Sequence, residues 1–242
     1  MPQPIQPAPI PTPPTNNAPR ILGLTLSTNR AEIGQSVTVT ANVTDDETLA
    51  SNLTYEWIAS AGTISGAGHV VVWTAPTDHS IPAVHTISLS VIETYGSPQA
   101  PQQHRVTDVS SAIYVDDSPR TVRSISEQFL RDFANSAVTP ETCLQNFSDS
   151  CRGKASERSD IINNRRVYTI RDSQFSNWRM RLSSTLSSGT VTVRCKFTST
   201  IKATGATEVA DGDCELTLIY ESNRWWLCNS SYHSLNGMMF IF

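Results

Sequence analysis

Residues 190–200 read TVTVRCKFTST, and residues 214–232 read CELTLIYESNRWWLCNSSY. In the first segment Val, Cys and Phe alternate with Thr, Arg and Lys, which is the two-residue period of a strand with one buried face. The second segment alternates in the same way, turns at residues 221–224 and returns as a strand from Trp225. Together they predict a three-strand antiparallel meander. It is the largest apolar wall in the sequence, so we expect the preceding helices to pack on it.

A helical pattern comes before this wall. Apolar residues recur at the spacing of an amphipathic helix at Ile125, Phe129, Leu130, Phe133 and Ala137. Residues 124–127 read as a capping box, so we expect the helix to begin at Ser124. A second helix is expected from Thr139, with proline at its first position, and a third over residues 156–164. From residue 166 onward we expect strands only, which gives an α+β order.

The first half of the chain shows strands and no helical period. Short β-branched or alternating segments separated by turn residues lie at 21–27, 36–43, 53–58, 69–73, 85–92 and 106–115. This spacing is typical of a β-sandwich. The prolines of residues 97–104 predict a surface loop there, since proline is excluded from central strands.

These patterns predict four parts. Residues 1–19 read MPQPIQPAPIPTPPTNNAP and predict an extended proline-rich tether, of the kind that follows a lipid anchor or a signal peptide. Residues 20–117 form an all-β sandwich, residues 118–123 a linker, and residues 124–242 an α+β domain with helices packed on a curved antiparallel sheet.

Charge and composition limit the function. The net charge of −4 divides into −7 for residues 1–117 and +3 for residues 118–242, so neither half is basic enough to predict nucleic-acid binding. No apolar run approaches the roughly 18 residues of a membrane span. Met1 leads straight into the proline-rich stretch, so we interpret the sequence as a mature exported form with an added Met, from which the export signal is absent.

All five cysteines lie in the second half, without a CxxC pair or zinc-like spacing. They are either buried free thiols or two disulfides and one spare thiol. Cys195 and Cys214 share the inward parity of one hairpin, and Cys143 and Cys151 bracket a short segment. Each pair requires Cα atoms within about 7 Å.

The segments LTYEWIASAGTISGAGHVVVWTAP (53–76) and HTISLSVIETYG (85–96) resemble bacterial immunoglobulin-like and polycystic-kidney-disease (PKD) type repeats. The Gly-Asp-Gly turn of the PKD type is replaced by Ser-Ala-Gly-Thr at residues 60–63. The resemblance implies a spacer or adhesion module of a cell surface.

The segments SISEQFLRDFANSAVTPETCLQNFSDSC (124–151) and ELTLIYESNRWWLCNSSY (215–232) resemble the nuclear-transport-factor-like cone, which includes SnoaL-like and ketosteroid-isomerase-like proteins. The resemblance implies a helical pair across a curved sheet. It also implies small-molecule binding in the cone, isomerisation or hydrolysis there, or dimerisation through the sheet.

Catalysis in such a cone needs a carboxylate base and hydrogen-bond donors within an apolar pocket. The polar residues expected to line it are Asp160, Tyr168, Tyr220 and Tyr232. They form no recognisable motif, and GxSxG, GxGxxG and phosphate-loop motifs are absent, so we predict no catalytic residue and no cofactor.

Two further segments suggest contacts. The run Asp45, Asp46 and Glu47 offers oxygen ligands for calcium, or is a solvated acidic loop. The apolar C-terminal end either folds back on the cone or contacts a partner through Met238, Met239, Phe240, Ile241 and Phe242.

The sequence therefore predicts a non-catalytic interaction subunit of an envelope or extracellular assembly, periplasmic or attached to the cell surface. Its partners would be other protein subunits or a second copy bound through the C-terminal sheet. The alternatives are a small-molecule binding protein using the cone, and an isomerase or hydrolase of SnoaL type.

Overall fold

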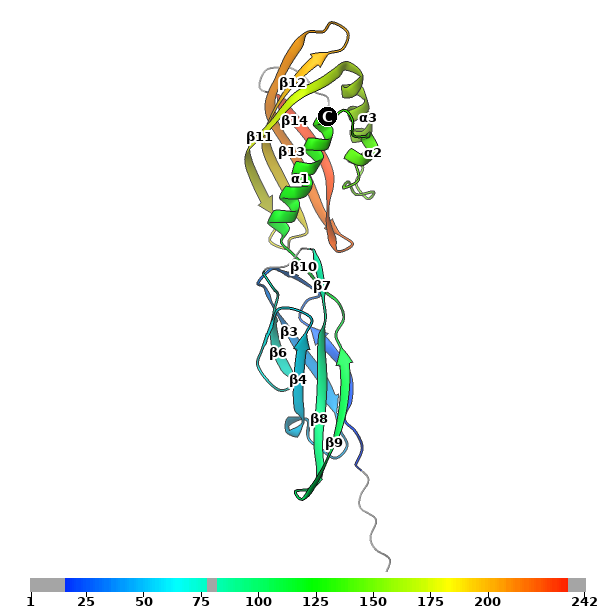
Figure 1. Ribbon diagram of the computed structural model, residues 1–242, viewed down its shortest axis with the longest axis vertical. Helices are drawn as coiled ribbons and strands as arrows, with labels where there is room; N and C mark the ends of the chain where they lie inside the picture. Colours follow the sequence, from blue (N-terminus) through cyan, green and yellow to red (C-terminus); the bar gives the residue numbers. More distant parts are fainter. Residues whose placement is uncertain (1–15, 78–81, 235–242) are drawn as a thin grey trace, which may run out of the picture. The chain divides into compact units, whose positions relative to one another are not determined.

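The computed structural model describes residues 16–77 and 82–234, and the chain divides into two compact units (Figure 1). The first unit comprises Met1–His79 and Ala83–Val115, and the second comprises Ser80–Pro82 and Asp116–Phe242. The division lies close to the boundary predicted at residue 117. None of the helices within the described residues is long and apolar enough to cross a bilayer.

The first unit consists of short strands and one 3-10 turn, Ala50–Asn52. Its strands are β1 (Arg20–Leu26), β2 (Arg30–Glu32), β3 (Ser36–Thr44), β4 (Thr54–Ala59), β5 (Thr63–Ser65), β6 (Val70–Thr74), β7 (Ala83–His85), β8 (Ile87–Ser97), β9 (Ala100–Val109) and β10 (Ile113–Asp116). They form sheets of order β1-β3-β6-β5, β4-β8-β9 and β2-β10-β7.

The two larger sheets share a core. Ala41 of β3 packs with Leu89 and Val91 of β8, because alternate residues of each strand face inward. Trp73 is fully buried, and its indole N–H donates to the Ala61 carbonyl at 2.7 Å. Gly62 allows this contact, since a Cβ there would collide with the Trp73 ring. The predicted strand pattern of this half is therefore present.

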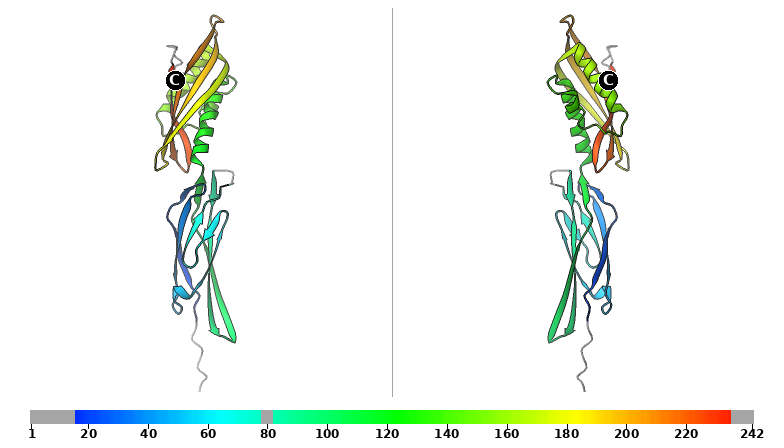
Figure 2. Two further views of the ribbon diagram at one scale, coloured as in Figure 1. Left: turned by 90° about the vertical axis from the view of Figure 1, so that its left-hand side faces the viewer. Right: turned by 90° about the vertical axis from the view of Figure 1, so that its right-hand side faces the viewer.

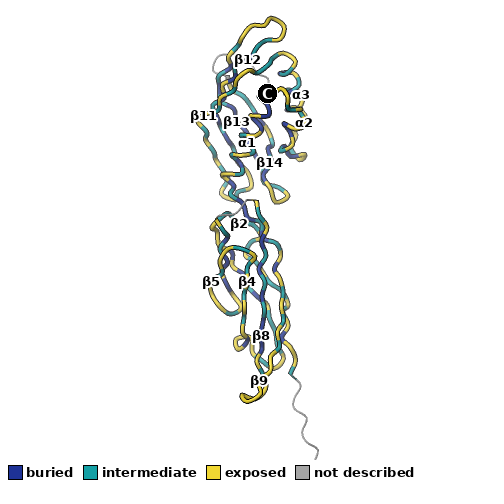
Figure 3. Tube along the Cα trace, viewed as in Figure 1, coloured by how far each residue is buried: buried dark blue, intermediate teal, exposed yellow. Residues whose placement is uncertain are grey.

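The surface loop predicted at residues 97–104 is wrong. β8 and β9 form a long hairpin that turns between Ser97 and Ala100, and its tip is exposed (Figure 3). Pro101 is accommodated because β9 is an edge strand, where one backbone N–H is not needed for pairing.

Glu93 of β8 is a fully buried carboxylate that ties three segments together. It accepts hydrogen bonds from the Thr48 hydroxyl at 2.5 Å and from the Asn16 side-chain amide at 2.7 Å. The His104 Nδ1 atom lies 3.2 Å from it, and the His104 Nε2 atom lies 3.1 Å from the Tyr95 hydroxyl. A buried carboxylate is tolerated when its oxygens are paired in this way.

We expect Glu93→Ala to lower the free energy of unfolding by about 2–4 kcal/mol, because it leaves buried polar partners without their acceptor. The measurement is urea unfolding of the full chain. The control is Glu56→Ala, since the half-exposed Glu56–Arg105 pair should contribute less than about 1 kcal/mol. Equal losses in the two variants would contradict a structural role for the Glu93 network.

Over residues 116–234 the second unit has three helices and one sheet. The helices are α1 (Ser118–Ala134), α2 (Pro140–Cys143) and α3 (Gly153–Val167), and the strands are β11 (Tyr168–Leu182), β12 (Ser188–Ile201), β13 (Thr207–Glu221) and β14 (Arg224–Ser234). The strands pair antiparallel in the order of the chain. The helices lie on one face of the curved sheet (Figures 1 and 2). The α+β order is confirmed, and the chain after residue 166 forms the expected meander preceded by one long strand, β11.

The start of α1 was predicted wrongly, and so was the linker at residues 118–123. The helix begins at Ser118, because the Asp117 carboxylate accepts from the Arg120 backbone N–H and Pro119 suits the first turn. Ser118 is buried, and its hydroxyl accepts from the Trp225 indole N–H at 2.9 Å. Glu127 does not cap the helix but pairs with Arg131 at 2.6 Å.

Two disulfides are present in the second unit. The predicted Cys195–Cys214 bond joins the inward faces of β12 and β13, with Cα atoms 6.1 Å apart. The predicted Cys143–Cys151 bond is wrong, since Cys151 pairs with Cys228 at a Cα distance of 5.2 Å. Cys143 is a buried free thiol at the end of α2. Disulfides of this kind fit an oxidising compartment.

Peptide mapping without reductant should therefore recover Cys151 linked to Cys228 and Cys195 linked to Cys214. Cys143 should alkylate only after denaturation, because its side chain is buried and burial raises the pKa of its thiol. The same digest after reduction is the control. A Cys143–Cys151 peptide in native protein would contradict this connectivity.

Candidate functional site

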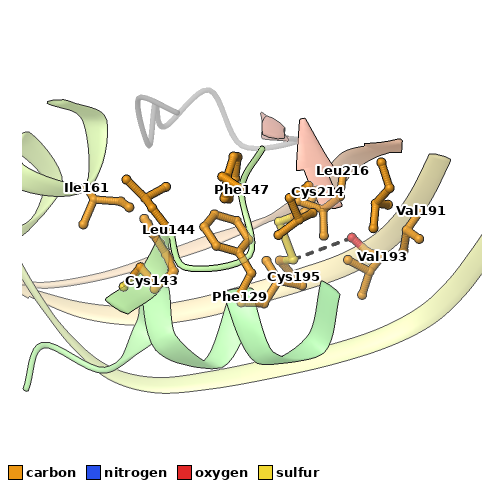
Figure 4. Close-up of a cluster of buried hydrophobic side chains, with 14 of the residues drawn as sticks. Phe129, Cys143, Leu144, Phe147, Ile161, Val191, Val193, Cys195, Cys214 and Leu216 are labelled. Atoms are coloured by element: carbon orange, nitrogen blue, oxygen red, sulfur yellow. Dashed lines mark hydrogen bonds between the residues drawn. A yellow bond between two sulfur atoms is a disulfide. The ribbon is translucent and has the colours of Figure 1, made fainter. Parts of the chain in front are cut away.

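The space between the helices and the sheet is filled by side chains. Phe129 and Phe147 meet edge-to-face with centroids 5.1 Å apart, and Phe133 meets Phe197 at 5.8 Å. In Figure 4 the Cys195–Cys214 bond lies beside Phe129, within the same cluster. Aromatic rings and a disulfide thus fill the space between the helices and the sheet.

A small pocket remains at the C-terminal ends of α1 and α3. Its volume is about 10 Å³, roughly the space of one water molecule. It is lined by Phe133, Ala134, Ser136, Asn164, Arg165, Tyr168 and Ile170. The guanidinium of Arg165 donates to the carbonyls of Asp132, Asn135 and Val138, which satisfies the end of α1. We infer that this arginine is committed to the fold.

The polar residues predicted to line the cone do not converge. Tyr168 lies at the small pocket, Tyr220 packs on Trp225 at 5.6 Å, and Tyr232 packs near Phe197 at 6.3 Å. Asp160 is half-buried on α3 and accepts from Ser156 at 3.4 Å. The structure gives these four residues separate packing environments.

Glu157 is a buried carboxylate that the sequence analysis missed. One carboxylate oxygen accepts from the Ser230 backbone N–H at 2.8 Å and from its hydroxyl at 2.7 Å, so it caps the free edge of β14. Burial raises the pKa of Glu157, and the Ser230 hydrogen bonds oppose that rise. The sequence does carry a signal for the burial of Glu157, namely its helical spacing to Ile161 and Asn164, which places all three residues on the buried face of α3.

Glu157→Gln should become more stable relative to the natural protein as pH rises. The raised pKa means that folded Glu157 keeps its proton to higher pH than the unfolded chain. Its contribution is therefore full below the ordinary Glu pKa and is lost as pH rises through the folded pKa. We expect a gain on the order of 1 kcal/mol at neutral pH, measured by urea unfolding between pH 4 and 8.

Glu141→Gln is the matched control, because Glu141 is exposed and its own backbone hydrogen bond and Arg158 lower its pKa. Its difference from the natural protein should not grow in the stabilising direction as pH rises. A pH-independent effect of Glu157→Gln would contradict the burial of a titrating carboxylate.

The predicted calcium ligands are engaged elsewhere. Asp45 accepts from the backbone N–H groups of Glu47 and Thr48, Asp46 pairs with Arg20, and Glu47 accepts from Asn17. Within residues 16–77 and 82–234, no three acidic, His or Cys side chains gather as a metal site. The acidic run is a structured turn. The predicted contact residues Met238, Met239, Phe240, Ile241 and Phe242 lie outside the described residues.

A larger cleft lies between the first turn of α1 and strands β11 and β12. It has a volume of about 450 Å³. We call it the Arg–Trp cleft, and its lining residues are Asp117, Pro119, Arg120, Arg123, Trp178, Arg179, Met180 and Val191. All of them belong to the second unit. The sequence analysis missed it, although Arg120 and Arg123 stand one helical turn apart.

A β-bulge shapes this cleft. Ser176 pairs with Arg194 and Arg179 with Thr192, so β11 carries one extra residue between these pairs. The guanidinium of Arg123 lies 3.7 Å from the centroid of the Trp178 ring within the bulge, in cation–π geometry.

A second groove of about 530 Å³ crosses the outer face of the sheet. It shares Arg179 with the Arg–Trp cleft and is otherwise lined by Arg181, Thr190, Thr192 and Glu215. The two hollows therefore differ in character. The groove on the outer face of the sheet is polar and arginine-rich. The Arg–Trp cleft is apolar, with arginines at its edge.

Comparisons with known proteins find matches among solved structures only, all of them of low similarity. No family model and no curated protein matches this chain. A ketosteroid isomerase-like protein from Erwinia carotovora atroseptica is 13% identical, with a TM-score of 0.42 over 48% of this chain and 95% of that one. A Novosphingobium aromaticivorans protein named as a suspected aromatic ring hydroxylase is 10% identical, with a TM-score of 0.40 over 49% and 90%.

A Mycobacterium tuberculosis protein of unknown function is 12% identical, with a TM-score of 0.38 over 48% of this chain and 70% of that one. Identities and TM-scores this low transfer no activity and no site residue. The function has to be argued from the residues of this chain.

Proposed function

We propose that the second unit is a nuclear-transport-factor-like domain that binds another protein and carries out no reaction of its own. The observation behind this proposal is the filled interior. Phe129, Phe133, Phe147 and Phe197 pack there with a disulfide, and the small pocket beside them has only about 10 Å³.

The competing functions need space in that interior. Sites for small organic ligands occupy about 300–1,000 Å³, and an isomerase or hydrolase also needs a carboxylate and a hydrogen-bond donor facing one substrate. Glu157 is buried and holds the edge of β14 through Ser230. Its place in the packing supports a structural role for this carboxylate.

The first unit, in this proposal, is an immunoglobulin-like spacer behind a proline-rich tether of residues 1–19. The assembly is exported, and its partners are other envelope or extracellular protein subunits, or a second copy bound through the C-terminal sheet. A lipid anchor upstream would hold it at a surface. The two disulfides support export, because such bonds persist in oxidising compartments.

Native mass spectrometry of the full chain without reductant tests the closed interior. We expect the polypeptide mass less four hydrogens, for two disulfides, and no bound organic molecule. In NMR titrations with benzene, the signals of the interior residues Phe129 and Phe147 should not shift in the natural protein. Phe197→Ala, which opens an apolar cavity, should bind benzene.

Phe197→Leu is the milder variant if the alanine variant does not fold. A carried ligand, or benzene shifts at these interior residues of the natural protein, would favour the small-molecule functions and overturn the proposal.

A further inference from the structure

We propose that the Arg–Trp cleft binds an acidic segment of a partner protein that inserts one apolar side chain between the arginines. The proposal rests on the protein-binding function above and assigns it a surface and a partner chemistry.

The floor of the cleft suits an apolar anchor. Trp178, Met180 and Val191 line it from the sheet, and Pro119 lines it from α1. Val191 is almost completely buried, whereas Trp178 and Met180 are half-buried and leave ring and thioether surface at the cleft. A volume of about 450 Å³ accommodates a Leu or Phe side chain with its neighbouring backbone. Such aromatic-floored pockets carry much of the binding energy of peptide interfaces.

The rim of the cleft is cationic. Arg120 is exposed, the Arg123 guanidinium lies over the Trp178 ring, and Arg179 is about two-thirds exposed in a surface pair with Asp213 at 3.3 Å. The Arg123 Nε atom is buried and lies 3.7 Å from a carboxylate oxygen of Glu127, which makes an ion pair without a hydrogen bond. Stacking on an aromatic ring fixes the guanidinium plane and prepares its edge to bind a carboxylate.

The single acidic side chain of the cleft does not cancel this charge. The Asp117 carboxylate is engaged as the helix cap and accepts from the Arg120 backbone N–H at 3.1 Å. Three guanidinium groups therefore surround an apolar floor, and the carboxylates of Glu127 and Asp213 that pair with Arg123 and Arg179 lie outside the lining of the cleft. Charge complementarity selects an acidic partner, and the floor selects one with an apolar residue among its acidic residues.

The arrangement favours a protein over a small anion or a nucleic acid. The arginines border a wide apolar floor and extend from α1 to β11, whereas a phosphate site gathers its donors around one point. The second half of the chain carries a net charge of only +3, which is low for a nucleic-acid-binding surface.

The test uses the full chain and a fluorescein-labelled probe peptide, Glu-Glu-Leu-Phe-Glu-Glu with blocked ends, in anisotropy titrations at low salt. We expect a Kd below about 100 µM that weakens at least tenfold in 0.5 M salt. Replacing Leu and Phe of the probe by Ala should weaken binding at least fivefold. A probe with Lys in place of Glu should not bind.

Arg120→Glu should raise the Kd of the protein for the unsubstituted probe at least tenfold. Its fold should persist, since Arg120 is exposed and a glutamate in the first turn of a helix is favourable. Arg171→Glu is the control, because Arg171 is an exposed arginine of β11 outside the cleft. It should leave the Kd within about twofold.

Three results would overturn the proposal: no probe binding, equal losses in the two variants, or displacement of the probe by 1 mM inorganic phosphate. Equal losses would mean general charge attraction, and phosphate displacement would mean a simple anion site. The benzene experiment tests the closed interior separately. If the benzene experiment shows a closed interior and the peptide does not bind, this cleft is rejected as the binding site. The proposed protein-binding function would then remain in place.

Discussion

The second unit depends on covering the inner face of one curved sheet. β12 and β13 present alternating apolar residues, and α1 supplies Phe129 and Phe133 to cover them. The bond from the Trp225 indole to Ser118 fixes the first turn of α1 against the sheet. Phe129, Phe133 and Phe147 are the aromatic side chains of this cover, and with their aliphatic neighbours they leave only the small pocket at the ends of α1 and α3. The same packing that stabilises the unit removes room for a ligand.

The disulfides act on this packing in different ways. Cys195–Cys214 lies between adjacent strands inside the core, where it replaces two apolar side chains. Cys151–Cys228 joins residues 77 positions apart and ties the start of α3 to β14. Closing the longer loop removes more entropy from the unfolded chain. The Cys151–Cys228 disulfide therefore contributes more than the Cys195–Cys214 disulfide to holding α3, with its buried Glu157, against the edge of β14.

The sequence predicted the strands well because their period is local. The strand expected over residues 190–201 is β12, Ser188–Ile201, with the inward residues as expected. The errors concern contacts between distant residues or competing local signals. The helix begins after Asp117, with Pro119 in its first turn, and not at the capping box of Ser124. Cys143, and not Cys151, is the cysteine that faces the core. The Arg–Trp cleft depends on a bulge in β11, and a one-residue bulge leaves no clear mark in a strand pattern.

A closed interior moves the question of function to the surface. On a surface, isolated arginines are common and contribute little, so the arrangement matters more than their number. In the Arg–Trp cleft the bulge places Trp178 beneath Arg123. The bulge lies in β11, which is an edge strand of its sheet. Irregularities kept at edges often re-aim one side chain or prevent unwanted pairing. Here the bulge holds Trp178, which forms an aromatic floor beneath the Arg123 guanidinium. The edge strand that carries the bulge thus also carries the cleft in which we propose that a partner binds.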